Sequence, residues 1–237
     1  MCLAARPAAA QDHDSAPAHM PSILSLFTQL AGDARHLATG RNLEVVAAGG
    51  ATALLFKPRD VRVNAFIQDS DDAENTFDAG DAIGGGVQQM GGAFATYFLG
   101  RALSNPRLAI VGAELVRAQL LNGGITQGLK ITVNRRRPDR GLHSFPSGHA
   151  SASFATATVI QHEYGWKAGI PAYALASYVG VSRLSENSHF ASDVAFGAAV
   201  GIVSARAVTV GHGATHVRVS PIANPHTRAF ELTVLRD

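Results

Sequence analysis

Three short phrases between residues 130 and 193 decide the predicted fold. They read Lys130-Ile-Thr-Val-Asn-Arg-Arg-Arg-Pro138, then Pro146-Ser-Gly-His149, then Ser182-Arg-Leu-Ser-Glu-Asn-Ser-His-Phe-Ala-Ser-Asp193. Each phrase combines cations, histidines or small polar residues, which are the groups that bind an oxyanion and transfer protons to it. Their order along the chain predicts a single site that is assembled from three segments.

The spacing within the first and third phrases favours helices. Lys130 and Arg137 are seven residues apart, about two helical turns, so both side chains can point the same way. His189 and Asp193 are four residues apart, which places them on one helical face. A carboxylate at this position can accept a hydrogen bond from one imidazole nitrogen, which fixes the tautomer and leaves the other nitrogen free as a nucleophile.

The middle phrase leads into the helical-looking sequence that follows His149. Free backbone N–H groups at the start of a helix favour an anion, and Gly148 lets the backbone approach it closely. Ser147 can cap this helix and bind the anion at the same time. His149 would lie beside the anion as a proton donor. Three cations would neutralise a phosphate and its developing charge: Lys130, Arg137 and Arg183.

These phrases resemble the three-part signature of the type 2 phosphatidic acid phosphatase (PAP2) superfamily. That signature reads K-x6-RP, PSGH and SR-x5-H-x3-D, and the sequence matches it at every fixed position. The resemblance implies an all-α helical bundle of the PAP2/haloperoxidase-like type. It also implies that His189 attacks phosphorus, that His149 protonates the leaving oxygen and then activates water, and that Asp193 orients His189. The phosphoryl oxygens would be held by Lys130, Arg137, Ser147, Gly148 and Arg183.

The predicted function is hydrolysis of phosphate monoesters or diphosphates through a phosphohistidine. Only seven residues separate Pro138 from Pro146, which leaves little material for a lid and favours lipid-type substrates. A broad-specificity periplasmic acid phosphatase is one alternative. A vanadate-dependent haloperoxidase that binds vanadate through His189 is another, although such relatives are generally longer chains. A non-catalytic protein that binds lipid phosphates is a third.

Composition bounds these interpretations. Of 237 residues, 46% are hydrophobic, 16% are charged and 24 are glycine, which suits one domain of closely packed helices. The net charge of +2 gives no reason to expect nucleic acid as a partner. Cys2, the single cysteine, allows no internal disulfide. Zinc-ligand spacing and a P-loop pattern are both absent from the sequence, so we predict no metal and no cofactor.

The chain divides into three predicted parts. Residues 1–20 form a disordered tail or the remnant of a signal peptide, residues 21–212 form the helical catalytic domain, and residues 213–237 form a small β-hairpin with alternating segments at 216–219 and 230–234. Residues 60–79 are expected to be a solvated loop with a short helix. Helices are expected over residues 22–39, 42–56, 82–103, 107–133, 147–164, 166–184 and 189–209.

The apolar stretches are short for a membrane-spanning helix, which needs about 20 strongly apolar residues. Several are interrupted by charge, at Glu44, Glu114, Arg117 and Arg206. We therefore predict a periplasmic or exported protein that is soluble or peripheral, with association with a membrane surface left open. Arg135 and Arg136 fit a solvated face as well as the site, and the histidines other than His149 and His189 are expected to be surface or satisfied core residues.

Overall fold

The structure is a computed structural model that describes residues 20–69, 77, 79–209, 215–224 and 227–236. The predicted tail lies outside the described residues, except for Met20, and so does most of the acidic segment after Asp69. The helices are α1 (Ile23–Thr28), α2 (Leu30–His36), α3 (Gly40–Phe56), the 3-10 turn η1 (Lys57–Arg59), α4 (Asp60–Gln68), α6 (Ala79–Gly84), α7 (Gly86–Ala102), α8 (Pro106–Val133), α9 (Gly148–Tyr164), α10 (Trp166–Ser185) and α11 (Ala191–Thr209). The predicted all-α bundle is confirmed.

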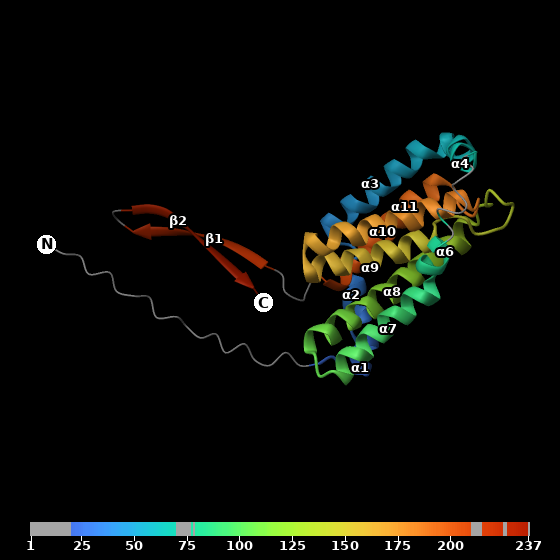
Figure 1. Cartoon of the computed structure of the whole chain (residues 1–237). Helices are drawn as coiled ribbons and strands as arrows, with labels where there is room; N and C mark the ends of the chain where they lie inside the picture. The colour runs from blue at the N-terminus through green and yellow to red at the C-terminus, as the bar shows by residue number, and fades with distance from the viewer. Residues whose placement is uncertain (1–19, 70–76, 78, 210–214, 225–226, 237) are drawn as a thin grey trace.

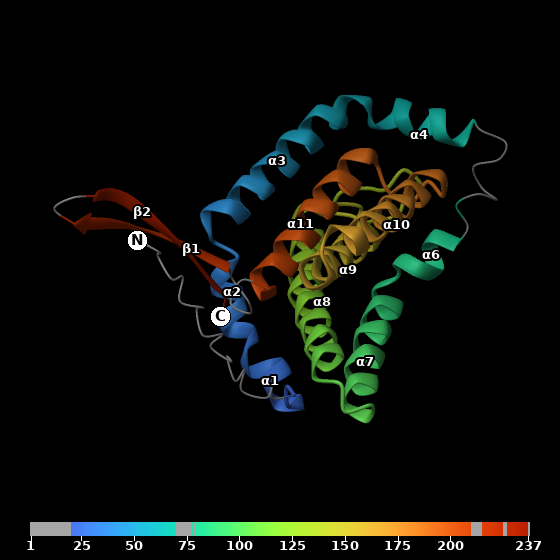
Figure 2. The ribbon, with the colours of Figure 1, turned by 60° about the vertical axis from the view of Figure 1, so that its left-hand side comes forward.

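Helix α9, which begins at the PSGH phrase, is the centre of the bundle. It packs against α8, α10 and α11, while α7 covers α8 and α3 covers α11 (Figures 1 and 2). The core between these helices consists largely of small and β-branched residues such as Val116, Ala155 and Val159. A Cβ added at Gly201 of α11 would lie 2.1 Å from the carbonyl oxygen of Ser151. The glycine content therefore allows the close helix packing that the composition predicted.

Two of the predicted helices are broken. The helix predicted over residues 22–39 is divided at Gln29, whose side chain accepts a hydrogen bond from Arg117 Nη1 at 2.7 Å. The same guanidinium pairs with buried Asp33 at 3.0 Å. The helix predicted over residues 82–103 is divided at Gly85, which has an extended backbone with ψ of 139°. The hydrophobic pattern runs through both breaks, so it could not reveal them.

The C-terminal segment contains two strands, β1 (Thr215–Asn224) and β2 (Thr227–Arg236). They pair in antiparallel register from Thr215 with Arg236 to Asn224 with Thr227. Both strands are longer than the alternating segments from which the hairpin was predicted.

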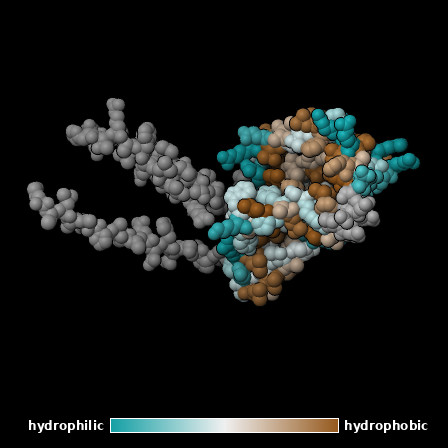
Figure 3. Space-filling model, turned by 45° about the horizontal axis from the view of Figure 1, so that its top comes forward, coloured by the Kyte–Doolittle hydropathy of each residue, from teal (hydrophilic) through white to brown (hydrophobic). Residues whose placement is uncertain are grey.

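Many large apolar side chains are exposed on the bundle. On the face in Figure 3, apolar residues interrupt the polar surface over much of the helical body. The exposed large apolar side chains on α3, α4, α7 and α10 include Leu54, Leu55, Val61, Phe66, Val87, Trp166 and Ile170. Helices α8 and α11 are long and apolar enough to cross a membrane, although they are largely buried here and a core helix of a soluble protein has the same properties.

Candidate active site

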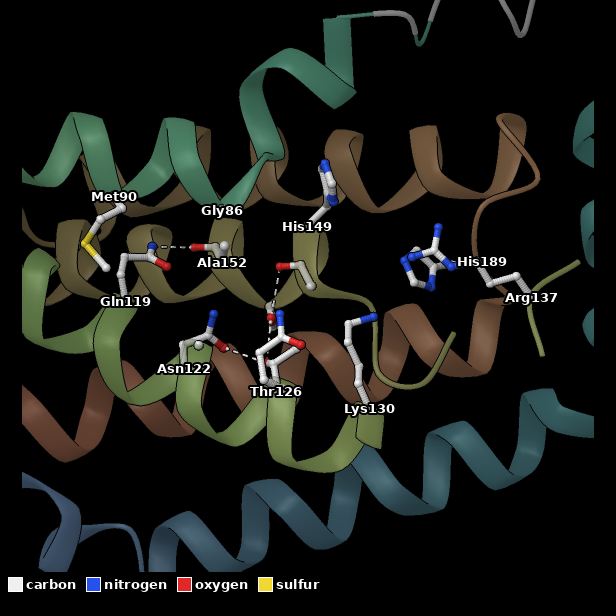
Figure 4. A pocket seen from close by; sticks show the side chains of 14 residues that line it. Gly86, Met90, Gln119, Asn122, Thr126, Lys130, Arg137, His149, Ala152 and His189 are labelled. Carbon is white, nitrogen blue, oxygen red and sulfur yellow. Dashed lines mark hydrogen bonds between the residues drawn. The ribbon is translucent and has the colours of Figure 1, made fainter. Parts of the chain in front are cut away.

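A cavity of about 400 Å³ opens between α7, α8 and α9. In Figure 4, Lys130 and Thr126 lie on one side of it and His149 on the other, with His189 and Arg137 at one end and Met90 and Gln119 at the opposite end. Five of the eight predicted site residues line this cavity: Lys130, Arg137, Gly148, His149 and His189. The other three are buried but are not among its lining residues: Ser147, Arg183 and Asp193.

His189 lies in the turn before α11, which begins only at Ala191. The prediction that His189 and Asp193 share one helical face is therefore wrong in its local detail. Asp193 Oδ2 accepts the N–H of Phe190 at 2.9 Å, as an acidic residue in the first turn does when it caps a helix. This cap sets the N-terminal end of α11, so His189 lies outside the helix.

Contacts from distant segments hold the His189 backbone in place. Its N–H donates to the carbonyl of Arg183 at 3.1 Å, and its own carbonyl accepts from Asn64 Nδ2 at 3.0 Å. The His189 side chain is 4% exposed, and its Nδ1 lies 3.8 Å from Asp193 Oδ2, with no hydrogen-bond partner in the described part of the chain. Burial is the main reason that the pKa of His189 is lowered. That Asp193 orients His189 stays a prediction.

Asp193 is completely buried among hydrogen-bond donors. Besides Phe190 N–H, it accepts from Arg135 Nη1 at 2.7 Å and from the hydroxyl of Ser144. Burial by itself raises the pKa of Asp193, but the nearby His189 imidazole, the hydrogen bonds from Ser144 and from the Phe190 N–H, and the charge of Arg135 outweigh burial and hold this pKa below its ordinary value. Asp193 therefore stays ionised beside His189.

Arg135 is part of the site, and the solvated-face interpretation is wrong for this residue. Its guanidinium donates to Asp60 at 2.8 Å as well as to Asp193, and to Ser192 Oγ at 2.7 Å. It also lies over the Phe190 ring, 4.4 Å from the centroid. Arg136, the next residue, is exposed as that interpretation expected.

Helix α4 supports the site. Residues 60–79 were predicted to be a solvated loop with a short helix, and the contacts of that helix with the site were missed. Asp60 is 2% exposed and accepts the backbone N–H and the hydroxyl of Ser192 at 2.9 and 2.6 Å. Asn64 holds the His189 carbonyl, and Gln68 Nε2 donates to the carbonyl of Leu184 at 3.4 Å. These three polar residues recur every four positions, and that stripe was the signal that could have revealed a packed helix.

Two reciprocal contacts connect Lys130 to His143 in the loop after α8. Lys130 Nζ donates to the carbonyl of His143 at 2.7 Å, and His143 Nδ1 is 3.0 Å from the carbonyl of Lys130. His143 is thus satisfied locally, as expected for a histidine outside the motif. Burial, followed by the charge of Arg137, lowers the pKa of Lys130 to about 8.

The PSGH phrase starts α9 as predicted. Ser147 Oγ accepts the N–H of Ala150 at 3.4 Å, and its own N–H donates to the carbonyl of Asp193 at 3.0 Å. A Cβ at Gly148 would meet Lys130 and Thr126 only at 3.8 and 3.9 Å, so this glycine leaves space on the cavity side. Anion binding by this helix start stays a prediction, and so does a direct contact between Ser147 and phosphate.

Arg183 and His149 share a partner that the sequence did not single out. Asp81 Oδ1, in α6, lies 2.7 Å from Arg183 Nη1 and 3.1 Å from His149 Nε2. Arg183 also donates to Glu186 and to the hydroxyl of Ser182. Burial and then the charge of Arg183 lower the pKa of His149 to about 4, against the opposing effect of Asp81.

The model of the PAP2 superfamily matches residues 112–215, a stretch that contains all eight predicted site residues. This stretch of the chain is therefore similar to the PAP2 superfamily. Residues outside this stretch, including Asp60, Asn64 and Asp81, come from α4 and α6 and complete the surroundings of the motif residues.

Two characterised relatives share part of this sequence. Lipid A 1-phosphatase of Porphyromonas gingivalis is 44% identical over 87 residues, which are 35% of this chain and 20% of that protein. Lipid A 4'-phosphatase of Helicobacter pylori is 29% identical over 99 residues, which are 37% of this chain and 50% of that protein. The matched segments thus span about a fifth and half of the relatives' lengths.

A solved structure supports the fold. The crystal structure of Aquifex aeolicus LpxE superposes with a TM-score of 0.53 at 21% sequence identity, covering 64% of this chain and 94% of that one. At this level of identity the likeness concerns the arrangement of the helices alone.

Proposed function

We propose that this chain is a metal-independent phosphatase that hydrolyses phosphate monoesters or diphosphates of lipids through a phosphohistidine on His189. The observation that carries the proposal is the meeting of five motif residues, from α8, the loop after it, the start of α9 and the turn before α11, around one cavity of about 400 Å³. The cavity is lined by two imidazoles and two cations: His149, His189, Lys130 and Arg137.

In the proposed reaction, a ring nitrogen of His189 attacks phosphorus as the bond to the leaving oxygen breaks. His149 gives its proton to that oxygen. The neutral His149 then takes a proton from the water that attacks phosphorus as the P–N bond to His189 breaks. Inorganic phosphate and free His189 result. A positioned acid of this kind contributes on the order of 10²–10⁴ in rate.

The cations give the site its affinity for phosphoryl oxygens. Lys130 and Arg137 face the cavity and would neutralise the charge that develops on these oxygens. Arg183 would join them once its guanidinium turns part of its donors toward the anion. No three His, Cys, Asp or Glu side chains within the described ranges are grouped to hold a metal ion.

Two observations support a lipid as the substrate. Both characterised relatives are named for a phosphatase of lipid A. The apolar residues exposed on α3, α4, α7 and α10 offer a surface for acyl or prenyl chains or for a membrane. We propose accordingly that the chain associates with a membrane and acts on its periplasmic side.

A phosphate-release panel on the purified protein tests this function. Phosphatidic acids of increasing chain length, below their critical micelle concentrations, should be hydrolysed with kcat/KM that rises with length, because each buried CH₂ adds about 0.8 kcal/mol to binding. A kcat/KM that does not change with chain length, or a preference for glucose phosphate, would favour the broad-specificity acid phosphatase.

Activity should persist in EDTA and be inhibited by vanadate. Loss of activity on chelation, with recovery on adding a divalent ion, would contradict metal independence.

A further inference from the structure

One carboxylate oxygen joins two residues of the motif. Oδ1 of Asp81 is within hydrogen-bond distance of both His149 Nε2, at 3.1 Å, and Arg183 Nη1, at 2.7 Å. Asp81 lies outside the stretch that matches the family model. Its side chain is 64% exposed, so burial does not explain why it occupies this place.

The backbone of α6 fixes the position of Asp81. A Cβ at Gly80 would lie 2.1 Å from Ser182 Oγ, and one at Gly84 would lie 2.2 Å from Val179 Cγ1. These two glycines are one helical turn apart and therefore lie on the same face of α6. Because neither has a Cβ, this face can pack directly against α10. The contact between α6 and α10 therefore delivers Asp81 to Arg183 and His149 despite its exposure.

A second contact holds the end of α6. Gln89 Nε2, in α7, donates to the carbonyl of Ile83 at 2.8 Å, and Gln89 Oε1 accepts from Thr156 Oγ1 of α9 at 2.6 Å. The segment that carries Asp81 is thus hydrogen-bonded through α7 to α9, the helix that carries His149 in its first turn. These hydrogen bonds fix the position of Asp81 relative to His149.

We propose that Asp81 is a positioning residue of this site, which holds His149 with its proton on Nε2 and leaves Nδ1 to exchange protons with the leaving group and with water. The inference rests on the proposed phosphatase function. The carboxylate accepts the Nε2–H, so the neutral ring keeps its lone pair on Nδ1. The same oxygen also holds the Arg183 guanidinium beside this imidazole.

The charges around His149 set the expected pH effect. It faces Asp81 from α6, Arg183 from α10 and His189 from the turn before α11. The carboxylate of Asp81 raises the pKa of His149, while Arg183 and His189 lower it. Removing the carboxylate charge should therefore move the protonation of His149 to lower pH.

The kinetic test compares Asp81→Asn and Asp81→Ala with Glu44→Gln, which removes an exposed charge from α3 outside the site. Asparagine can donate as well as accept, so it no longer selects the Nε2–H form. We expect both Asp81 variants to lose about 10- to 100-fold in kcat, a part of what an acid–base group contributes, with KM changed less than about threefold. The limb of the pH profile that belongs to His149 should move to lower pH.

Two kinetic results would overturn the proposal. Wild-type kcat and an unmoved pH profile would show that Asp81 does not act through His149. A lower KM with unchanged kcat would show that the carboxylate instead competes with the substrate phosphate for Arg183. Glu44→Gln should match wild type in every measurement.

A readout that does not need activity separates this proposal from the proposed function. The ¹⁵N spectrum of histidine-labelled protein, with the His149 signals assigned by their loss in His149→Gln, should show the proton on Nε2 in the wild type and a mixture of tautomers in Asp81→Asn. The same tautomer in both proteins would refute the positioning role. A change of tautomer in a chain that releases no phosphate would refute the phosphatase function alone.

Discussion

The two histidines of the site lie in unequal surroundings. His189 is 3% exposed, and α4, α10 and the loop after α8 reach the residues around it through Asn64, the Arg183 carbonyl and Arg135. The side chain of His149 is 29% exposed, and within the described residues its ion-pair partner is the exposed carboxylate of Asp81. His189, the proposed nucleophile, is thus fixed by a buried network, whereas His149, the proposed acid–base group, is contacted by a carboxylate from a six-residue helix.

The largest expected effect separates the two histidines themselves. His189→Ala removes the attacking atom and should lower kcat by roughly four orders of magnitude or more. His149→Ala removes only the proton transfer and should cost on the order of 10²–10⁴. Steady-state phosphate release checks both, with circular dichroism to show that the fold persists. Comparable losses in the two variants, or turnover by folded His189→Ala, would contradict the assigned roles.

The network behind His189 can be broken at Arg135, with Arg136 as its matched neighbour. Arg135→Lys leaves a single ammonium where a guanidinium bridged Asp60 and Asp193, two buried carboxylates. Complete loss of a partner to a buried charge costs about 3–5 kcal/mol, so the lysine variant should lose part of this stability together with about tenfold or more in kcat.

Thermal unfolding and phosphate release measure these two losses. Arg136→Lys, at an exposed position, should behave as wild type in both assays. Equal behaviour of the two variants would mean that the network around Asp193 does not hold the nucleophile.

A smaller effect concerns Lys130, which lies on the cavity side opposite His149. Since its pKa is lowered to about 8, the free enzyme loses this positive charge as pH rises through about 8. We expect kcat/KM to fall above that pH, by up to about tenfold per unit, because this parameter reports groups of the free enzyme. Lys130→Arg should retain its charge and lose this limb, whatever its absolute rate; an unchanged alkaline limb in that variant would assign it to another group.

The sequence predicted the helix boundaries next to the motif well because they depend on local features. The start of α9 at Gly148 and the end of α8 after Lys130 follow from the cap at Ser147 and from the apolar pattern. Prediction failed where long-range contacts decide. The i, i+4 spacing of His189 and Asp193 suggested one helix, but a backbone cap begins α11 after His189.

The residues of α4 and α6 that contact the site could not be predicted either, because long-range contacts bring them there. Asp60, Asn64 and Asp81 carry no motif, and only the fold shows that they meet Arg135, the His189 carbonyl and His149. Asp81 in particular is exposed and follows a stretch rich in acids, so composition favoured a solvated loop. Its place depends on two glycines that pack against α10, which is a property of paired helices and not of either sequence alone.

The smallest effect on the chemistry is expected from the outer face of α4, whose inner face supports His189. Val61 and Phe66 are 76% and 81% exposed there, the reverse of a helix that buries its apolar side. If this face contacts a membrane, Phe66→Ser should weaken binding to anionic lipid vesicles by about 1 kcal/mol, or about fivefold, because only part of the ring is buried. Hydrolysis of a soluble monoester should be unchanged.

Asn64→Ala, on the inner face of α4, should have the opposite effect. It removes the hydrogen bond to the His189 carbonyl, so kcat should fall on every substrate while vesicle binding stays constant. Equal vesicle binding by Phe66→Ser and wild type would exclude this face from membrane contact, and a loss of monoester hydrolysis in the same variant would show that the outer face also supports the site.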